Sequence, residues 1–363
     1  MSKGLVLITG GAGFIGSYTA EELLRAGYRV RLLDNLTPPV HTGEWPDWLP
    51  DCERMAGDVR NRDDWQKALR GVDYVVHLAA HQDLLPNFSQ FFHVNSVGTA
   101  LLYELVVAEK LPVKKVVVAS SQFVYGEGRY QCAKDGEVFP DGRDVAGGHW
   151  DPVCPKCSGV ITPLPLLETH ANPKNQYSIS KYSQELIAVA LGRNYGIPSV
   201  ALRYSIVQGA RQSFRNAYSG VLRVFTLSHL AGRPAPVFED GRQLRDYVNV
   251  EDVARANRLV LESEQANYEI FNVGGGKGYT VLEFAGIVSD TPPSVTGEYR
   301  VGDTRHSVSD ITKLQRLGWQ PTKTPADSVR DYVAWIRGQK LDKDYAAEAL
   351  ATLRQMGALR KAT

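Results

Sequence analysis

A glycine-rich segment that directly follows a short apolar run constrains the fold of this chain most strongly. Residues 5–9 (Leu-Val-Leu-Ile-Thr) have the length and composition of a buried strand, and a helical pattern runs from about Phe14 to Ala26. Gly10, Gly13 and Gly16 lie between them, where they allow a tight turn, close approach to a pyrophosphate, and close packing of helix on sheet. The helix N-terminus then offers free N–H groups to a phosphate. This strand–turn–helix unit predicts the start of a Rossmann-type sheet.

Further apolar strands are expected at residues 29–33, 74–77, 115–119 and 198–203, separated by helical segments. Such an alternation predicts an α/β fold, a doubly wound parallel sheet covered on both faces. After about residue 205 the pattern becomes irregular, which indicates a smaller C-terminal α/β lobe over the carboxyl ends of the strands. We therefore expect a Rossmann domain over residues 1–205, a substrate lobe over 206–330 with segments returning to the first domain, and a helical tail over 331–363.

Asp34 ends the second predicted strand, in the context that a dinucleotide site requires. A carboxylate there accepts hydrogen bonds from both ribose hydroxyls and repels a 2′-phosphate, so it favours NAD over NADP. The alternative is that Asp34 only caps a turn.

Tyr177 and Lys181 are four residues apart and therefore share one face of a helix. A tyrosine with an ordinary pKa near 10 needs a depression of roughly three units, about 4 kcal/mol, to act as a base at neutral pH. The lysine ammonium and the positively charged nicotinamide ring are sources of that shift. Ser121 follows a buried strand and is positioned to bind the same substrate hydroxyl. Without Ser121, a surface tyrosine–lysine pair would be the simpler interpretation.

Several motifs together resemble a known family. They are Ser120-Ser121-Gln122-Phe123-Val124-Tyr125-Gly126, Tyr177-Ser178-Ile179-Ser180-Lys181, Asn95-Ser96-Val97-Gly98-Thr99, Arg245-Asp246-Tyr247-Val248, Gly302-Asp303-Thr304-Arg305-His306 and Leu317-Gly318-Trp319-Gln320-Pro321. From residue 4 to about 320 the chain resembles an extended short-chain dehydrogenase/reductase of the NAD-dependent epimerase/dehydratase family. The resemblance implies that Ser121 is the catalytic hydroxyl rather than Ser120, that Tyr177 is the acid/base, and that Lys181 binds ribose.

The same resemblance implies the residues that bind cofactor and substrate. Cofactor contacts are expected at Gly10, Gly13, Phe14, Ile15, Gly16, Asp34, Asn35, Asp58, Val59, Leu78, Ala79, Ala80 and Asn95, together with Tyr177 and Lys181. A nucleotide-diphosphate sugar is expected to contact Ser121, Gln122, Phe123, Tyr204, Asn216, Phe238, Arg245 and Arg305, with the two arginines clamping the diphosphate.

Dehydratases of the family carry Asp-Glu directly after the catalytic Ser or Thr, where this chain has Gln122 and Phe123. Neither side chain is an acid or base at neutral pH, so the resemblance implies 4-epimerisation through a transient 4-keto sugar. Ile206 replaces an asparagine that relatives have near the sugar. The cysteine-bearing insertion and residues 238–245 resemble dTDP-L-rhamnose 4-epimerases and similar deoxysugar epimerases, which implies a dTDP- or UDP-(deoxy)hexose. The alternatives are a 4-ketoreductase or dehydratase of the family, or a catalytically silent Rossmann regulatory protein.

Three of the four cysteines lie in an insertion over residues 127–171, between the two catalytic motifs. Cys132-x-x-Asp135 and Cys154-x-x-Cys157 are separated by 18 residues, within the spacing of a four-ligand zinc ribbon. We expect a structural zinc at Cys132, Asp135, Cys154 and Cys157, with His149 as the competing fourth ligand. The alternative is three unrelated buried cysteines.

The formal net charge of +1 gives no electrostatic footprint for nucleic acid or an anionic membrane. The chain enters its first strand within a few residues and has no uncharged stretch of roughly 18 residues, so we expect a cytoplasmic enzyme without a membrane span. The resemblance further implies a homodimer that pairs through the helices after Asn95 and Tyr177.

Overall fold

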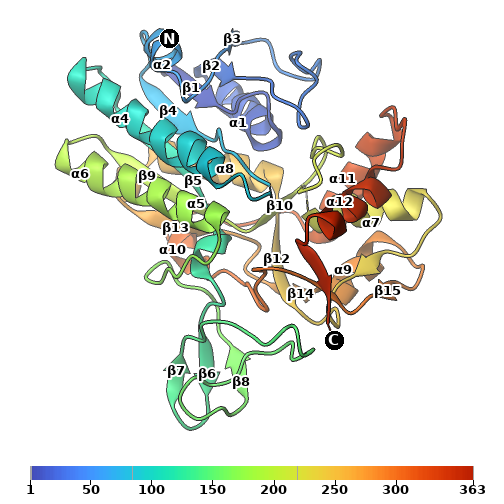
Figure 1. Ribbon diagram of the computed structural model, residues 1–363. Coiled ribbons are helices and arrows are strands. Elements are labelled where there is room, and N and C mark those ends of the chain that lie inside the picture. The colour runs from blue at the N-terminus through green and yellow to red at the C-terminus, as the bar shows by residue number, and fades with distance from the viewer. Residues whose placement is uncertain (1, 84, 219, 363) are drawn as a thin grey trace.

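The computed structural model describes residues 2–83, 85–218 and 220–362 (Figure 1). Its centre is a parallel sheet of seven strands, and the predicted Rossmann-type fold is confirmed. In spatial order the strands are β13 (Ile270–Val273), β9 (Ser199–Tyr204), β5 (Lys115–Ser121), β4 (Tyr74–His77), β1 (Leu5–Thr9), β2 (Arg29–Asp34) and β3 (Glu53–Ala56). The chain reverses direction of winding beside β1, where Ile8 pairs with Leu32 on one side and Val76 on the other.

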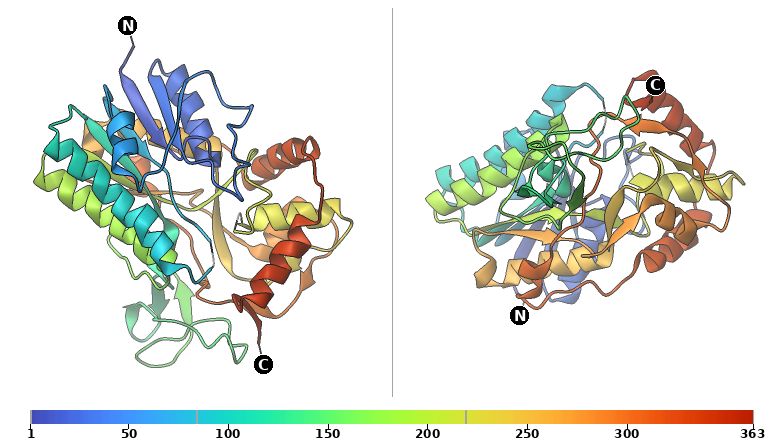
Figure 2. Two further views of the ribbon diagram at one scale, coloured as in Figure 1. Left: turned by 45° about the horizontal axis from the view of Figure 1, so that its top comes forward. Right: turned by 90° about the horizontal axis from the view of Figure 1, so that it is seen from below.

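Helices cover both faces of this sheet (Figure 2). On one face, α1 (Phe14–Arg25) and α8 (Val250–Glu262) bury Leu23 and Val260 against the strands. The other face is covered by α2 (Arg62–Ala68), α4 (Gly98–Ala108), α5 (Gln176–Leu186), and the π-helical η3 (Ile187–Leu191) and α6 (Gly192–Asn194) that continue α5. Strands buried on both faces explain why their sequences are almost continuously apolar.

One long helix is built from α3 (Phe88–Phe91), the π-helical η1 (Phe92–Val97) and α4. By length and apolar composition alone, Phe88–Ala108 is able to cross a membrane. However, 44% of its most apolar window is buried inside the protein, where α4 packs on the sheet and beside α5. Core helices pass the same test of composition, so this finding does not support a membrane span.

The second lobe has its own apolar core, which contains Phe225, Tyr247, Phe284 and Tyr332. Its strands are β10 (Ile206–Gln208), β12 (Leu244–Asn249), β14 (Gly278–Thr280), and the pairs β11 (Pro236–Val237) with β15 (Ser294–Val295) and β16 (Glu298–Arg300) with β17 (Leu359–Lys361). Its helices are α7 (Gly220–Leu230), α9 (Val281–Val288), α11 (Pro325–Arg337) and α12 (Tyr345–Gln355), while α10 (Thr312–Gln315) lies against β13. Because α11 runs through residue 330 and α12 packs on α7, residues 331–362 are part of this lobe rather than a separate tail.

The insertion over residues 127–171 forms a small antiparallel sheet that projects below the main body in Figure 1. Its strands are β7 (Gly136–Val138), β6 (Tyr130–Cys132) and β8 (Ile161–Pro163), in that order. Tyr130, Val138 and Ile161 make a core of few side chains, which includes Cys132 and Cys154.

Candidate active site

A cavity of about 410 Å³ opens at the carboxyl ends of the sheet strands, between the sheet and the second lobe. Gly10, Leu78 and Ser121 line it at the ends of β1, β4 and β5, and Phe238 and Arg245 line it from the lobe. Ligands of doubly wound folds bind at this edge.

The glycine turn borders the cavity, as the sequence predicts. Gly10 has a left-handed backbone (φ +65°), and a Cβ at Gly16 would lie 2.2 Å from the Gly10 carbonyl oxygen, so both positions require glycine. Gly13 precedes α1 and has no side chain with which to cap it. The first N–H groups of α1 therefore face the cavity next to Phe14 and Ile15, where they suit a diphosphate.

Asp34 ends β2 and is 8% exposed. One carboxylate oxygen accepts from the Ala12 N–H at 3.0 Å, and the other accepts from the Leu36 N–H at 2.9 Å. Asp34 thus does cap a turn, but each oxygen keeps acceptor capacity for a ribose hydroxyl. A buried anion at this point disfavours a 2′-phosphate, which suits NAD.

The remaining predicted cofactor residues divide into two groups. Leu78 and Ala80 line the cavity, and the Ala79 N–H donates to Thr9 Oγ1 at 3.1 Å directly behind it. Asn35, Asp58, Val59 and Asn95 are absent from the described residues that line the cavity, and so is Asp34.

The first three of these lie around the ends of β2 and β3, where Asn35 Nδ2 donates to Asp58 at 3.1 Å. Although burial opposes it, hydrogen bonds from Arg60 lower the pKa of Asp58 to about 2. Asn95 is fully buried, and its amide joins Ser180 of α5 to the backbone of His81. In this geometry Asn95 orders the cavity wall from behind.

The three predicted catalytic residues line the same cavity. Ser121 ends β5, and its Oγ accepts from the Phe123 N–H at 3.2 Å and hydrogen-bonds Tyr177. Tyr177 and Lys181 lie on α5, which begins with a capping box between Asn175 and Ser178. The cap fixes the start of the helix and with it the rotation that places both residues at the cavity.

Burial dominates the electrostatics of this pair. It raises the pKa of Tyr177, with a further contribution from Tyr218, and the Ser121 hydrogen bond only partly opposes the rise. Burial also lowers the pKa of Lys181 to about 7, and Lys181 Nζ donates to the Ala119 carbonyl and to Gln184 Oε1, each at 2.8 Å. The protein groups alone therefore do not give the lowered tyrosine pKa that the sequence suggests.

Ser120 has a different environment from Ser121. Its Oγ donates to Glu185 at 2.8 Å, and the same carboxylate accepts two hydrogen bonds from Arg203, at 2.6 and 2.9 Å. Ser120 thus belongs to a buried ion-pair network behind the sheet, although it also borders the cavity.

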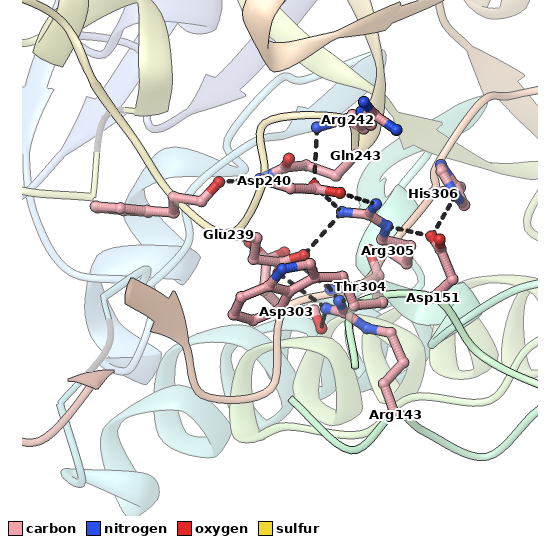
Figure 3. Close-up of polar contacts among 12 residues, drawn as sticks. Arg143, Asp151, Glu239, Asp240, Arg242, Gln243, Asp303, Thr304, Arg305 and His306 are labelled. Carbon is pink, nitrogen blue, oxygen red and sulfur yellow. Dashed lines mark hydrogen bonds and ion pairs between the residues drawn. The ribbon is translucent and has the colours of Figure 1, made fainter. Parts of the chain in front are cut away.

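Most of the predicted substrate residues line the cavity, namely Ser121, Gln122, Phe123, Tyr204, Asn216, Phe238 and Arg245. Arg305 is not among the described lining residues. Its guanidinium is directed into a cluster of carboxylates from Glu239, Asp240 and Asp151, at 2.7 to 3.1 Å (Figure 3). These carboxylates neutralise the Arg305 charge, and only 2% of the side chain is exposed. The structure therefore does not support a diphosphate clamp at Arg305.

The structure brings other polar residues to the cavity that sequence reasoning missed. Arg300 lines it together with Asp303, Tyr218 and Gln243. Arg300 Nε and Gln243 Oε1 are buried and have no hydrogen-bond partner among the described residues, so they are available to a ligand. Arg300 stands two residues before the Gly302-Asp303 motif, and that spacing was the signal available in the sequence.

The C-terminal segment also contributes to this cavity. Ala349, Leu350 and Leu353 of α12 form part of its wall. A bidentate ion pair from Arg354 to Glu298, at 2.7 and 2.9 Å, and the pairing of β17 with β16 hold this segment beside Arg300. No motif in the sequence signals this role.

The insertion brings together Cys132, Asp135, Cys154 and Cys157. One potential ligand atom from each lies within 4.8 Å of the others, and the Sγ atoms of Cys132 and Cys157 are 3.6 Å apart. An Asp135 oxygen lies 3.2 Å from Cys154 Sγ and 3.6 Å from Cys132 Sγ. His149 is not part of this group.

The chain is similar to several known proteins. A model of the NAD dependent epimerase/dehydratase family matches residues 6–144 and 153–274. A dTDP-L-rhamnose 4-epimerase of Burkholderia thailandensis is 32% identical, with 93% of this chain and 96% of that protein aligned. The solved UDP-glucose 4-epimerase of Thermotoga maritima with UDP-glucose has a TM-score of 0.75 at 29% identity, covering 92% of this chain and 98% of that one. The solved Thermus thermophilus UDP-glucose 4-epimerase in complex with NAD has a TM-score of 0.74 at 30% identity, covering 93% of this chain and 100% of that one.

Proposed function

The chain belongs to the NAD-dependent epimerase/dehydratase family, and from that premise we propose that it is an NAD-dependent 4-epimerase of nucleotide-diphosphate sugars. One observation carries the proposal. Ser121, Tyr177 and Lys181 share a single cavity with the glycine turn on one side and with Arg245 and Arg300 on the other. A nucleotide sugar that spans this cavity would place its sugar between the tyrosine and the cofactor.

The residues of the chain have separable roles in this chemistry. Tyr177 takes the proton from the 4-hydroxyl and later returns it, while Ser121 holds the oxygen that becomes the 4-keto group. Lys181, when protonated, favours the tyrosine phenolate. The glycine turn would hold NAD⁺, which would supply the hydride acceptor and donor for C4 of the sugar. Gln122 and Phe123 supply neither acid nor base, and therefore loss of water is not favoured.

We infer that the substrate is a dTDP- or UDP-linked deoxyhexose. Phe123 lies 6.2 Å from Tyr177 between ring centroids, and Ile206 lines the same cavity, so the sugar meets an apolar surface that suits a methyl group at C6. The similarity to a dTDP-L-rhamnose 4-epimerase supports the same substrate class. We assign the diphosphate chiefly to Arg300, whose Nε has no partner among the described residues, because a guanidinium fork matches phosphate oxygens. Arg245 lies beside it as a second positive charge, with its guanidinium oriented by the Leu244, Thr304 and Arg305 carbonyls.

We also infer a structural zinc held by Cys132, Asp135, Cys154 and Cys157. Zinc–sulfur bonds of about 2.3 Å in a tetrahedron separate the sulfur atoms by roughly 3.7 Å, close to the 3.6 Å between Cys132 and Cys157. Three thiolates and a carboxylate are a suitable donor set. Four protein ligands leave no open position, so the role is to stabilise an insertion whose own core is small.

A homodimer that pairs through the helices bearing Asn95 and Tyr177 is part of the proposal. Val106 and Ala188 pack on their own sheet, but Val97 is 46% exposed on η1 and Leu186 is 49% exposed on α5. These helices run side by side in Figures 1 and 2, and a second copy packed along them would cover these exposed apolar residues. The cytoplasm is the proposed location, because four free cysteines accord with a reducing compartment.

Incubation with a panel of dTDP-, UDP- and GDP-sugars, followed by proton NMR, tests the function. We expect a 4-epimer from a dTDP- or UDP-sugar without added cofactor, because an epimerase regenerates its NAD in each turnover. A 4-ketoreductase would instead require stoichiometric reduced cofactor, and a dehydratase would give a 4-keto-6-deoxy product. A silent Rossmann protein would change no sugar in the panel.

A further inference from the structure

Arg143 lies in the insertion, yet its guanidinium is buried at the junction with the other two parts of the molecule (Figure 3). Nε donates to Glu127 at 2.8 Å, Nη1 donates to Glu239 at 2.9 Å and to the Trp150 carbonyl at 2.8 Å, and Nη2 donates to Glu239 at 3.1 Å and to the Asp303 carbonyl at 2.9 Å. All five N–H donors of the arginine are therefore satisfied. Only 1% of the side chain is exposed.

The partners of Arg143 are next to residues of the cavity. Glu127 directly follows the turn that begins at Ser121, and its second oxygen accepts from the Arg305 N–H at 2.9 Å. Glu239 adjoins Phe238, which lines the cavity. Asp303 lines the cavity too and pairs with Arg245 at 3.2 Å. One insertion side chain thus joins the catalytic turn to the lobe that would hold the nucleotide diphosphate.

The backbone at Glu239 shows how strongly this junction determines the local structure. Glu239 has φ +53°, a left-handed conformation that non-glycine residues rarely adopt. Such a conformation is strained for a residue with a side chain and persists only where surrounding contacts over-determine it. Arg143 and Arg305 supply part of those contacts, since both guanidiniums bond the Glu239 carboxylate. The backbone N–H of Glu239 adds another by donating to the Glu298 carbonyl at 2.7 Å.

We propose that Arg143 is a positioning residue for the diphosphate end of the cavity, so that the insertion takes part in substrate binding without touching the substrate. This inference rests on the proposed function, because it assumes that Arg245, Arg300 and Asp303 face a nucleotide diphosphate. Loss of Arg143 frees Glu239 and the Asp303 backbone. The nucleotide-binding residues then move relative to Ser121, while the glycine turn on the far side of the cavity is unaffected.

Lysine is a poor substitute at this position. It offers three donors from one nitrogen, whereas Arg143 bonds four different residues, one of them in a bidentate manner. We therefore expect the substitutions Arg143→Lys and Arg143→Gln to weaken binding in increasing order. A matched control is Arg129→Gln, because among the described residues the Arg129 guanidinium bonds only Glu137, at 2.6 Å, and the Pro165 carbonyl, both within the insertion.

The experiment measures the affinity of the full-length protein for dTDP and for UDP by titration calorimetry, with retained NAD and the unfolding temperature recorded in parallel. For whichever nucleotide the wild-type protein binds, we expect Arg143→Gln to lower the affinity by about tenfold or more. Arg143→Lys should weaken it by an intermediate factor, and Arg129→Gln should match wild type. In turnover, KM should rise while kcat changes by less than about threefold, and NAD should remain bound.

Asp151→Asn guards against a variant that fails to fold. Asp151 is 71% exposed and lies at the outer side of the Arg305 cluster, 2.7 Å from Arg305 and 3.7 Å from His306, so this variant should fold and weaken nucleotide binding by a few-fold. Nucleotide affinities of Arg143→Lys and Asp151→Asn equal to wild type would overturn the inference. Equal loss of NAD and nucleotide would also overturn it, because that pattern indicates a general loss of structure. Wild-type protein that binds neither dTDP nor UDP would contradict the proposed function itself, and the inference with it.

Discussion

At the scale of single residues, the phenol of Tyr177 carries the proton transfer on which the proposed reaction depends. Tyr177→Phe removes one oxygen from a side chain whose ring still packs against Phe123 and Tyr218. We expect turnover to fall below detection while NAD stays bound, as judged by sugar NMR and by the cofactor released on denaturation. Near-normal activity in this variant would remove Tyr177 from the mechanism.

The two neighbouring serines give a matched pair of substitutions. Ser121→Ala removes the hydroxyl that contacts Tyr177, and we expect kcat to fall by about 10²–10⁴. Ser120→Ala removes one bond to Glu185 from a network that Arg203 still holds, so the effect on kcat should be mild. Steady-state kinetics of both variants decide the assignment, and a reversed ranking would transfer the catalytic role to Ser120.

Substitution of the two arginines at the lobe, Arg300 and Arg305, should have different effects, the first on substrate binding and the second on stability. Arg300→Gln should raise KM for the nucleotide sugar by about tenfold with little change in unfolding temperature, because Arg300 Nε has no partner within the described chain. Arg305→Gln leaves Asp240 without its bidentate partner and Glu239 paired with Arg143 alone, and should lower the free energy of unfolding by about 3 kcal/mol. Denaturant titration and kinetics test both, and a larger KM effect at Arg305 than at Arg300 would restore the sequence-based assignment.

The sequence is most informative where a function needs neighbours along the chain. The glycine turn, Asp34 and the Tyr177–Lys181 pair are each defined within one strand–turn–helix or one helix, so their local spacing is sufficient to predict their position. Arg300 and Arg305 are five residues apart in an irregular segment, where no periodicity indicates which side chain faces the cavity. Only the packing of Glu239 and Asp240 against Arg305 separates them.

At the scale of elements, the insertion provides a test of the metal site. We expect about one zinc per chain in protein purified without chelator, and a large loss in Cys154→Ser. Asp135→Ala should lower the zinc content and His149→Ala should not, because only Asp135 lies with the cysteines. Elemental analysis of the four proteins measures this. At most a trace of zinc in wild type would refute the site, and the opposite ranking would make His149 the ligand.

The face formed by η1, α4 and α5 provides a test of assembly. Leu186→Glu places a charge in the proposed interface and should give a monomer by sedimentation velocity at micromolar concentration. Leu230→Glu is the control, since Leu230 is also exposed, at 37%, but lies on α7 of the other lobe. A wild-type monomer, or dimers in both variants, would argue against this interface.

Elements were predictable where they are apolar and regular. The strands β1, β2, β4, β5 and β9 match the expected positions within a few residues, because strands buried on both faces have continuous apolar sequences. The edge strand β3 has no such signature, because the side chains of Glu53 and Arg54 are exposed. The closing of the cavity by α12 depends on contacts across the whole lobe, which local sequence does not encode.

At the scale of the whole molecule, three parts meet around one cavity. The sheet presents the glycine turn and the catalytic triad, the lobe presents Arg245 and Arg300, and the insertion reaches both through Arg143. This arrangement explains how one type of fold can hold a cofactor at one end of the cavity while the other end adapts to the nucleotide sugar.

The central claim is that one bound cofactor removes and returns hydride at C4 of a nucleotide sugar. The most direct measurement uses a dTDP- or UDP-sugar substrate from the panel, carrying deuterium at C4, with the enzyme as purified in ordinary water. We predict that the epimer retains deuterium at C4, that no added NADH is consumed, and that no water is lost from the sugar. Loss of the deuterium to solvent, or a product that forms only with stoichiometric NADH, would contradict the account.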